Sequence, residues 1–314
     1  KLGRIYYDKL VIACGATTNF FGDKSFEEKT FSLKSLSESL FLRNAILTDL
    51  ESALMTPEYE KRQGYIDIVI VGGGATGVEL AGALAEMKHY IIPKDYPELD
   101  ENEIDIHLIH GGPRLLMGMS ERSSQKALDF LVKLGVNVEL NKRVIGFDGQ
   151  HVTTKDGDKI HAHKVIWAAG ITANRLEGID GDMLNYGNRI NVNNLNEVKG
   201  VKDIYAIGDI AYMSTEAYPD GHPQVAQGAI QQSANLAYNL IHNKSRPFKY
   251  KDLGSLATVG RNKAVADLPS FKLSGFGAWL LWLFVHLMSL IGFKNKVFVL
   301  LNWMWNYLTY DQSL

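Results

Sequence analysis

The amino-acid sequence predicts an α/β fold of doubly wound parallel sheets. Two observations predict it: buried strands alternate with helices along the first half of the chain, and a glycine cluster directly follows one of these strands. The chain has 314 residues, 46% of them hydrophobic, which is enough for a packed core and suggests two domains rather than one.

The alternation consists of apolar runs that carry a strand or a helix period. Buried strands are expected at residues 8–13, 66–71, 104–109, 136–140 and 164–168. Helices are expected at about 35–55, 77–87 and 121–134. Short strands at 144–147 and 151–154, with a turn at Asp156-Gly157, form an antiparallel meander of the kind that flavoproteins with two dinucleotide-binding domains insert. A loop-rich stretch after residue 172 leads to a strand at 203–207 and a helix at about 225–241.

Charge and cysteine content exclude two classes of function. The chain carries 33 basic and 35 acidic side chains, so it lacks the excess of Lys and Arg that nucleic-acid binding requires. Its only cysteine, Cys14, lies in an apolar run, which rules out an intramolecular disulfide and a CxxC redox pair. Any redox chemistry must therefore come from a cofactor.

The glycine cluster has the spacing of a dinucleotide-binding turn, with a strand before it and a helix after it. Gly72 permits the tight turn, Gly74 lets the backbone approach a pyrophosphate, and Gly77 lets helix and strand pack closely. The alternative is a glycine-rich turn in a sheet that binds no nucleotide. Because strand, spacing and helix agree, we predict a nucleotide site.

The second strand of such a unit usually ends in an acid that takes the ribose hydroxyls. Here it ends in His110. A neutral imidazole can still hydrogen-bond a hydroxyl, although it repels a 2′-phosphate less than a carboxylate does. We expect NADH rather than NADPH as the nucleotide.

Several stretches of sequence form a wider pattern. They are residues 7–15, 18–22, 71–84, 112–116, 167–170, 205–209, 226–232 and 263–267. Together they resemble the type II NADH:quinone oxidoreductases, over nearly the whole chain. The resemblance implies a flavoprotein that transfers a hydride from NADH to FAD and two electrons onward to a membrane quinone, without proton pumping.

The resemblance also implies cofactor contacts, with Gly15, Gly208 and Asp209 at FAD and Ala169 and Gly170 at NADH. Read by itself, Asp209 is a carboxylate at a helix start, which can accept hydrogen bonds from ribityl hydroxyls or simply cap the helix. In the family an N-terminal strand-turn-helix with its own glycine motif holds the FAD pyrophosphate. No segment here can do so, and we expect a chain that is cut at both ends.

Four further residues are expected at the reacting groups. Glu79 matches a glutamate near nicotinamide and flavin, where we expect it to orient the reactants, unless it only complements the helix dipole. Gln227 and Gln231 share one helical face and match amides that can bind quinone oxygens. Lys263 matches a lysine beside flavin and quinone; the alternative is a surface lysine.

The last 44 residues hold four of the five tryptophans, at positions 279, 282, 303 and 305. Two mostly apolar stretches, 275–293 and 297–310, are separated by Lys294-Asn295-Lys296 and carry thin polar edges. We expect two helices lying on an anionic membrane surface, at the cytoplasmic face of the inner (plasma) membrane. A dimerisation face or a buried cap is the alternative, and a homodimer is possible.

These patterns give a predicted domain order. Residues 1–31 belong to an FAD-binding domain, 32–172 to an NADH-binding Rossmann domain, 173–270 to the rest of the FAD-binding domain, and 271–314 to membrane-associated helices. A ferredoxin-reductase-like enzyme would leave the tryptophan-rich tail unexplained, and sulfide:quinone chemistry needs paired cysteines. A non-catalytic fragment that binds nucleotide and membrane is the remaining alternative.

Overall fold

The computed structural model describes residues 3–309. The chain folds into two compact units. The first comprises residues up to 19 together with 171–253, and the second comprises 20–170 together with the residues from 254 onward. The chain passes between them near residues 19, 170 and 253, whereas the domain boundaries expected from sequence are 31, 172 and 270. The assignment of these domains to FAD and NADH stays a prediction.

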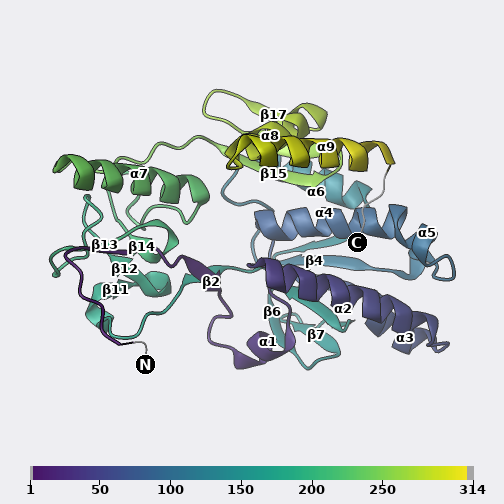
Figure 1. The fold of residues 1–314 in the computed structure, drawn as a ribbon. Coiled ribbons are helices and arrows are strands. Elements are labelled where there is room, and N and C mark those ends of the chain that lie inside the picture. The colour runs from purple at the N-terminus through teal and green to yellow at the C-terminus, as the bar shows by residue number, and fades with distance from the viewer. Residues whose placement is uncertain (1–2, 310–314) are drawn as a thin grey trace. The chain divides into compact units, whose positions relative to one another are not determined.

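The second unit is built on a parallel sheet, as predicted (Figure 1). Its order is β5-β4-β3-β9, and the strands are β3 (Ile68–Val71), β4 (Ile106–His110), β5 (Val136–Leu140) and β9 (Lys164–Trp167). Alternate side chains of β3 enter two separate cores. Ile68 and Ile70 pack with the helices, whereas Val69 and Val71 pack with the antiparallel meander.

The helical face of this sheet holds α2 (Leu36–Leu54), α4 (Ala75–Tyr90) and α6 (Glu121–Lys133). The opposite face holds the short α1 (Lys24–Lys29) and the meander β6 (Val144–Phe147), β7 (His151–Thr154) and β8 (Lys159–His161). Ser35 and Glu38 form a capping box that begins α2. The doubly wound architecture is therefore confirmed, with the predicted meander on one face.

Several element boundaries differ from the sequence prediction. Residue 66 was expected to begin a strand, but α3 (Tyr59–Ile66) ends there and β3 begins at Ile68. Both positions bury an apolar side chain, so hydrophobicity alone does not separate them. Helix α4 begins at Ala75 rather than Gly77, because the glycine turn is only three residues long. A short helix, α5 (Ile92–Asp95), follows α4.

An unpredicted antiparallel sheet covers the outer side of α4. Its strands are β15 (Ser255–Gly260), β16 (Lys263–Asp267) and β17 (Lys272–Ser274). Gly82 allows the contact, because a Cβ there would stand 2.4 Å from the carbonyl oxygen of Val259. Asp267 fixes the sheet to the start of α6 by accepting hydrogen bonds from the Oγ of Ser120 (3.1 Å) and of Ser123 (2.6 Å).

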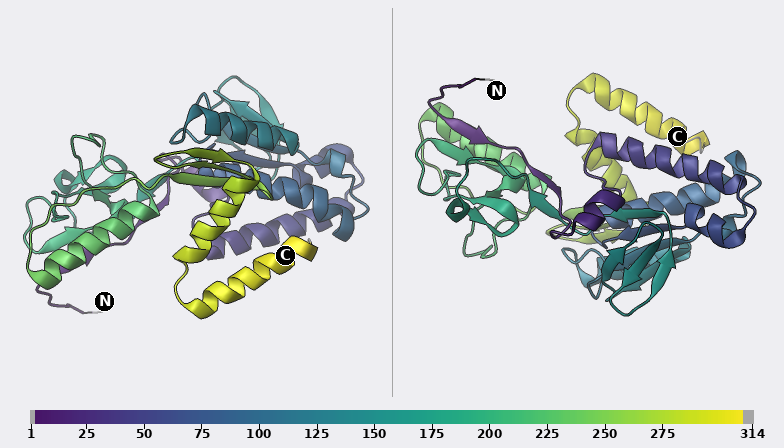
Figure 2. Two further views of the ribbon diagram at one scale, coloured as in Figure 1. Left: turned by 90° about the horizontal axis from the view of Figure 1, so that it is seen from above. Right: turned by 90° about the horizontal axis from the view of Figure 1, so that it is seen from below.

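Two helices follow this sheet, α8 (Phe276–Ser289) and α9 (Phe293–Thr309), shown from two further sides in Figure 2. The break lies at residues 290–292, where Gly292 has φ +85°, and not at Lys294–Lys296 as expected. The two lysines lie instead in the first turn of α9. Among residues 3–309, no helix is long and apolar enough to cross a membrane.

The first unit consists of small sheets and one long helix. Strand β1 (Leu10–Ile12) pairs in parallel with β13 (Ile204–Ala206), and β2 (Ala16–Thr18) pairs antiparallel with β10 (Ile171–Ala173). A third sheet has the order β11 (Leu184–Asn185), β12 (Arg189–Asn191), β14 (Ala211–Tyr212). Helix α7 (Ala226–His242) contains the predicted glutamines. The core includes Ile190, Val192, Ile210, Met213 and Phe248.

Candidate functional site

Glycine occupies the three positions of the motif for different structural reasons. Gly72 has φ +123°, and a Cβ there would lie 2.3 Å from the carbonyl oxygen of Ala168. A Cβ on Gly77 would lie 1.8 Å from the carbonyl oxygen of Gly72. Gly74 has nothing within 4 Å of its Cβ position and no positive φ. The fold therefore demands glycine at 72 and 77, but Gly74 only keeps space open.

The open space lies at the N-terminus of α4. Gly74 is the N-cap residue, so no side-chain oxygen caps the first amides of the helix, and its first turn carries no acid. Uncapped amides and the helix dipole together favour an anion at this end. The arrangement fits the pyrophosphate of a dinucleotide.

Ala169 and Gly170 follow β9 at the same edge of the sheet. The amide of Ala168 donates to the carbonyl oxygen of Val71 at 2.8 Å, which holds this segment against the end of β3. Because the ends of parallel strands meet at one edge, the predicted Ala169 and Gly170 lie beside the glycine turn.

The ring of His110 contacts the glycine turn. Its Nδ1 accepts a hydrogen bond from the amide of Gly73 at 3.1 Å. The ring lies between Gly73 and Gly112, since a Cβ on either would come within 2.8 Å of it. Nε2 is buried and has no partner in the described part of the chain. Burial lowers the pKa of His110, so the ring is neutral at physiological pH. Its contact with a ribose stays a prediction.

Glu79 lies on the second turn of α4, directed at the C-terminal elements of the same unit. Its Oε1 accepts the amide of Thr258 in β15 at 3.2 Å. Burial raises the pKa of Glu79, while the bond from Thr258, the charge of His286 and a hydrogen bond from Trp282 partly oppose that rise. A buried carboxylate with an elevated pKa beside a nucleotide turn is a candidate for a functional group.

Lys263 is not grouped with Glu79. It lies at the start of β16, where its charge acts on Glu86, a carboxylate whose pKa is raised by burial and lowered by the amide of Arg261 and by Lys263. Glu86 is seven residues further along α4, which corresponds to about 10 Å at 1.5 Å per residue. The charge of Lys263 therefore favours the ionised form of Glu86, and its role beside flavin and quinone stays a prediction.

Gly15, Gly208 and Asp209 meet at one edge in the first unit. They follow the paired strands β1 and β13, and the amide of Ile207 donates to the carbonyl oxygen of Ile12 at 3.0 Å. Gly15 has φ +69° and nothing within 4 Å of its Cβ position. Asp209 belongs to a single 3₁₀ turn, Gly208–Ile210, rather than to the start of an α-helix. An open glycine beside a carboxylate at the ends of parallel strands fits the ribityl and phosphate parts of FAD.

Gln227 and Gln231 lie on one face of α7, and both hold the segment before β15. The Oε1 atoms of Gln227 and Gln231 accept the amides of Leu253 and Lys251, each at 2.9 Å. Gln231 also donates to the carbonyl oxygen of Lys251 at 2.8 Å. The two amides thus have a structural task as well as the predicted one.

Sequence reasoning missed three residues. Gln232 is buried, and its Oε1 accepts the amide of Gly208 at 2.6 Å, which fixes the turn that carries Asp209. Its signal was a second glutamine beside Gln231 at a core-facing position. Trp282 and His286 on α8 favour the ionised form of Glu79. An effect across about 200 positions leaves no local signal in a single sequence.

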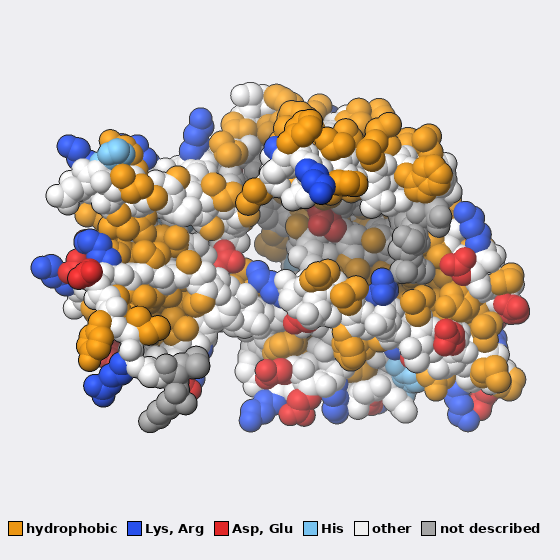
Figure 3. All heavy atoms as spheres, in the orientation of Figure 1, with side chains coloured by type: hydrophobic (Ala, Val, Ile, Leu, Met, Phe, Trp, Pro, Cys, Tyr) orange, Lys and Arg blue, Asp and Glu red, His pale blue; other side chains and the backbone are white. Residues whose placement is uncertain are grey.

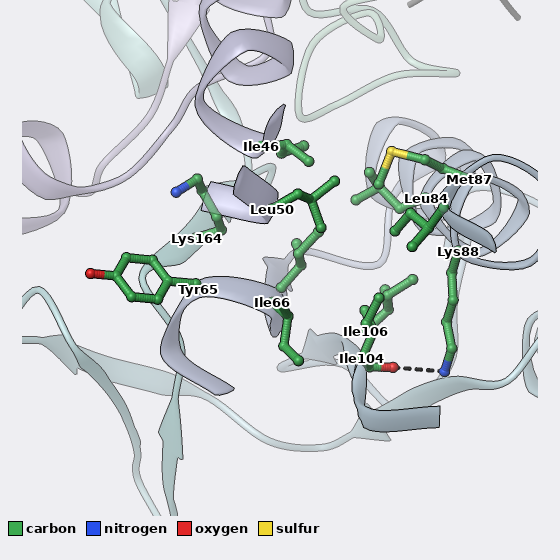
Figure 4. Close-up of a pocket in the computed structure, with 12 residues that line it drawn as sticks. Ile46, Leu50, Tyr65, Ile66, Leu84, Met87, Lys88, Ile104, Ile106 and Lys164 are labelled. Carbon is green, nitrogen blue, oxygen red and sulfur yellow. Dashed lines mark hydrogen bonds between the residues drawn. The ribbon is translucent and has the colours of Figure 1, made fainter. Parts of the chain in front are cut away.

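Two cavities lie apart from the glycine turn and the Gly208 turn. The first, shown in Figure 4, has a volume of about 10 Å³, room for one water, and is lined by core residues of α2, α4 and the sheet. Lys164 at its edge pairs with Asp49, and Lys88 donates to the carbonyl oxygen of Ile104 at 2.6 Å. The second, of about 600 Å³, lies in the first unit beside α7 and is lined by Gln231, Asn235, Arg246 and Phe248 among others. The first is a packing void rather than a substrate site.

Comparisons with known proteins agree with this geometry. Residues 1–233 match the family model described as pyridine nucleotide-disulphide oxidoreductase, and residues 253–310 match that of the NDH2 C-terminal domain. The type II NADH:quinone oxidoreductase Ndh of Mycobacterium tuberculosis is 34% identical over 96% of this chain and 68% of its own length. The type II NADH:quinone oxidoreductase of Haemophilus influenzae is 32% identical over 84% of this chain and 63% of its own length.

A solved structure shows the same fold. NDH2 from Plasmodium falciparum in complex with NADH superimposes with a TM-score of 0.88 over 96% of this chain and 78% of that one, at 22% identity. The chain spans about two thirds of the length of the curated relatives, between 63% and 68% of the two named above.

Proposed function

The chain belongs to the type II NADH:quinone oxidoreductases, FAD enzymes that transfer electrons from NADH to a quinone, and we propose which of its residues bind each reactant. NADH binds at the glycine turn of the second unit. The observation that carries this assignment is the open position at Gly74 beside the uncapped start of α4. The protein leaves that space open, and a pyrophosphate can occupy it.

NADH is preferred over NADPH because two cations near His110, Arg114 and Lys142, are already bound to other groups of the protein. Arg114 donates to the carbonyl oxygens of Met117 and Met119, each at 2.8 Å, and to the Oγ of Ser124 at 2.6 Å. Lys142 pairs with Glu139 at 2.6 Å and Asp158 at 2.5 Å. A 2′-phosphate near His110 would have to break these bonds, whereas a plain ribose would not.

FAD binds at Gly15, Gly208 and Asp209, and supplies the acceptor for the hydride of NADH. The chain contributes position and charge. Gln232 holds the Gly208 turn, so the Asp209 carboxylate can accept hydrogen bonds from hydroxyl groups. Glu79 orients the nicotinamide side of the site, since hydride transfer depends on alignment rather than on an acid or a base.

The quinone binds near Gln227 and Gln231. An amide offers two donor and two acceptor positions, so Gln231 keeps one of each after its bonds to Lys251. The donor can meet a quinone carbonyl, and the acceptor can meet the hydroxyl of the reduced product.

We assign α8 and α9 to the membrane surface. Their exposed side chains are largely apolar, and Figure 3 shows this gathering over α9. The side chains concerned include Phe284, Met288, Phe298, Leu301, Trp305 and Leu308, together with Ile291 in the loop between the helices. An exposed apolar patch of this kind marks a lipid or protein contact, and the substrate quinone is itself dissolved in lipid. The cytoplasmic face of the inner (plasma) membrane, where NADH is present, is the proposed location.

Liposome flotation of the intact protein tests this last assignment against a homodimer. Membrane docking predicts flotation with anionic vesicles and a protein that stays monomeric in detergent. A stable dimer that does not float would assign the apolar face to a second copy of the chain instead.

A further inference from the structure

The segment that follows α7 is strongly basic, although the chain as a whole has a net charge of −2. Residues 242–251, which we call the basic segment, contain no acidic residue and five basic ones, His242, Lys244, Arg246, Lys249 and Lys251. All five are exposed, and Figure 3 shows basic side chains gathered over the outer end of α7. The basic segment and α7 both belong to the first unit.

The basic segment is held in one conformation by buried amides. The carbonyl oxygen of Arg246 accepts hydrogen bonds from Nδ2 of Asn235 (3.1 Å) and of Asn239 (2.8 Å), and its N–H donates to Oδ1 of Asn239 at 3.0 Å. Phe248 is buried, and its amide donates to the carbonyl oxygen of Asn194 at 2.7 Å. The positive charges are therefore preorganised, and a ligand loses little binding free energy to ordering the segment.

The guanidinium of Arg246 is oriented as well. Its Nε donates to Oδ1 of the buried Asn235 at 2.7 Å, and the group lies 5.0 Å from the ring centre of Tyr238. Within residues 3–309 its two terminal nitrogens donate no hydrogen bond, and Nζ of Lys249 donates none either. A guanidinium whose terminal nitrogens are both available can bind two oxygens of one phosphate group.

A cavity of about 600 Å³ opens beside these two cations. Arg246, Lys249 and the buried Phe248 line it together with residues of α7, and no acidic residue belongs to its wall. A volume of this size holds a polar headgroup rather than a single ion. Two available cations without a competing carboxylate fit an anionic ligand, namely a phosphate group with its substituents.

The surroundings of the cavity favour a lipid over a soluble phosphate. Ile241 is 76% exposed and Tyr238 is 42% exposed, at the end of α7 where the basic segment begins. Lys244 and Lys251 lie outside the cavity wall, so a single soluble anion in the cavity leaves them unused. A membrane surface engages both kinds of side chain, because anionic headgroups attract the lysines and acyl chains accept the apolar groups.

We propose that the basic segment and its cavity bind the phosphate headgroup of an anionic phospholipid. Arg246 and Lys249 hold the phosphate, and Ile241 enters the acyl region. The first unit thereby has a membrane contact of its own, in addition to α8 and α9 of the second unit. Gln231, which we assign to the quinone, lines the same cavity, so the bound lipid places the bilayer next to the proposed quinone site. The inference rests on the proposed membrane location of the enzyme.

Vesicle binding of the intact holoenzyme tests the proposal. Arg246→Gln combined with Lys249→Gln is compared with a control, Lys155→Gln combined with Lys159→Gln, which removes the same charge from exposed positions of the second unit. Vesicles of phosphatidylcholine and phosphatidylglycerol should bind the first variant about tenfold or more weakly than the unmodified protein, since each cation at an anionic surface contributes about fivefold. The control should stay within about twofold. Vesicles of phosphatidylcholine alone should not distinguish the two variants.

Two further measurements do not depend on the double variant. Lys249→Gln alone should weaken binding about threefold to fivefold without changing Tm, because Nζ of Lys249 donates no hydrogen bond within the described residues. Hydrogen exchange followed by mass spectrometry should show that anionic vesicles protect residues 242–251. An excess of inorganic phosphate should not displace the vesicles.

Each outcome decides the proposal. Equal vesicle binding by the two double variants overturns it, and so does a basic segment that exchanges equally fast with and without vesicles. Displacement by inorganic phosphate assigns the cavity to a soluble anion, and protection by raised protein concentration alone assigns it to a second copy of the chain; either result overturns the lipid.

Failure of the proposed function is measured separately. Both double variants should reduce their flavin with NADH and reoxidise it with a water-soluble quinone, as the unmodified enzyme does. If the unmodified enzyme fails in that assay, the proposed function is wrong while the vesicle comparison still decides the lipid site. If the unmodified enzyme binds no anionic vesicle, the membrane location and this proposal are both wrong.

Discussion

Replacing Gly74 by valine should abolish NADH binding without damaging the fold. The Cβ position of Gly74 has no neighbour within 4 Å, and its φ of −76° suits any residue. The free energy of unfolding should therefore change by no more than about 0.5 kcal/mol. In the complex, however, the added side chain would occupy the space of the pyrophosphate.

The magnitude follows from the hydrogen bonds lost at the start of α4. A bond from an amide to a charged phosphate contributes about 1.5–3 kcal/mol. Losing two of them raises the Kd of NADH by about 100-fold or more. FAD content should be unchanged, because Gly15, Gly208 and Asp209 belong to the other unit.

Calorimetric titration with NADH, next to thermal unfolding and flavin content, measures all three quantities. Gly181→Val is the matched control, since Gly181 also has nothing within 4 Å of its Cβ position and no positive φ. Gly77→Ala should behave in the opposite way and lose stability first, because its Cβ meets a carbonyl oxygen at 1.8 Å. Unchanged NADH affinity in Gly74→Val would refute the nucleotide assignment, and loss of flavin would refute the separation of the two sites.

Three further predictions concern specificity, the quinone and pH. The kcat/KM of the intact enzyme should be about tenfold or more higher for NADH than for NADPH, since a misplaced phosphate costs at least one charge-assisted bond of about 1.5 kcal/mol; a preference for NADPH would refute the reading of Arg114 and Lys142. Gln231→Ala should leave flavin reduction by NADH near normal and slow reoxidation by quinone about fivefold to tenfold, as loss of about 1 kcal/mol implies, and slowed reduction would contradict its assignment; Gln227→Ala should do the same. Burial raises the pKa of Asp67 from 3.8 to about 7, so the folded protein holds a proton that the unfolded chain has released between those values, and stability falls as pH rises through that window. Asp67→Asn should accordingly raise Tm by about 2–4 °C at pH 8 and change it little at pH 4, and an equal shift at both would show that the carboxylate does not titrate this way.

The glycine turn and the parallel sheet could be predicted because their signals are local. The strand before Gly72 and the helix after the glycine turn are close in sequence, and each has its own hydrophobic pattern. The ends of α3 and β3 could not be separated, because Ile66 and Ile68 are equally buried in different elements. Short-range patterns report burial more reliably than they report the element that provides it.

The tail shows the limit of the same reasoning. Its two helices were predicted, but the sheet on which α8 packs was not. The predicted glutamines were found on one helical face, yet their bonds to residues 251–253 depend on a distant segment and leave no pattern in sequence.

The central claim is that NADH delivers electrons through bound flavin to a quinone. Anaerobic stopped-flow absorbance of the flavin in the intact holoenzyme tests it most directly, with NADH mixed first and a quinone second. We expect NADH to bleach the flavin, one equivalent for each flavin, and the quinone to restore its absorbance in a separate phase. A flavin that NADH does not bleach, or one that stays bleached in the presence of quinone, would contradict the account.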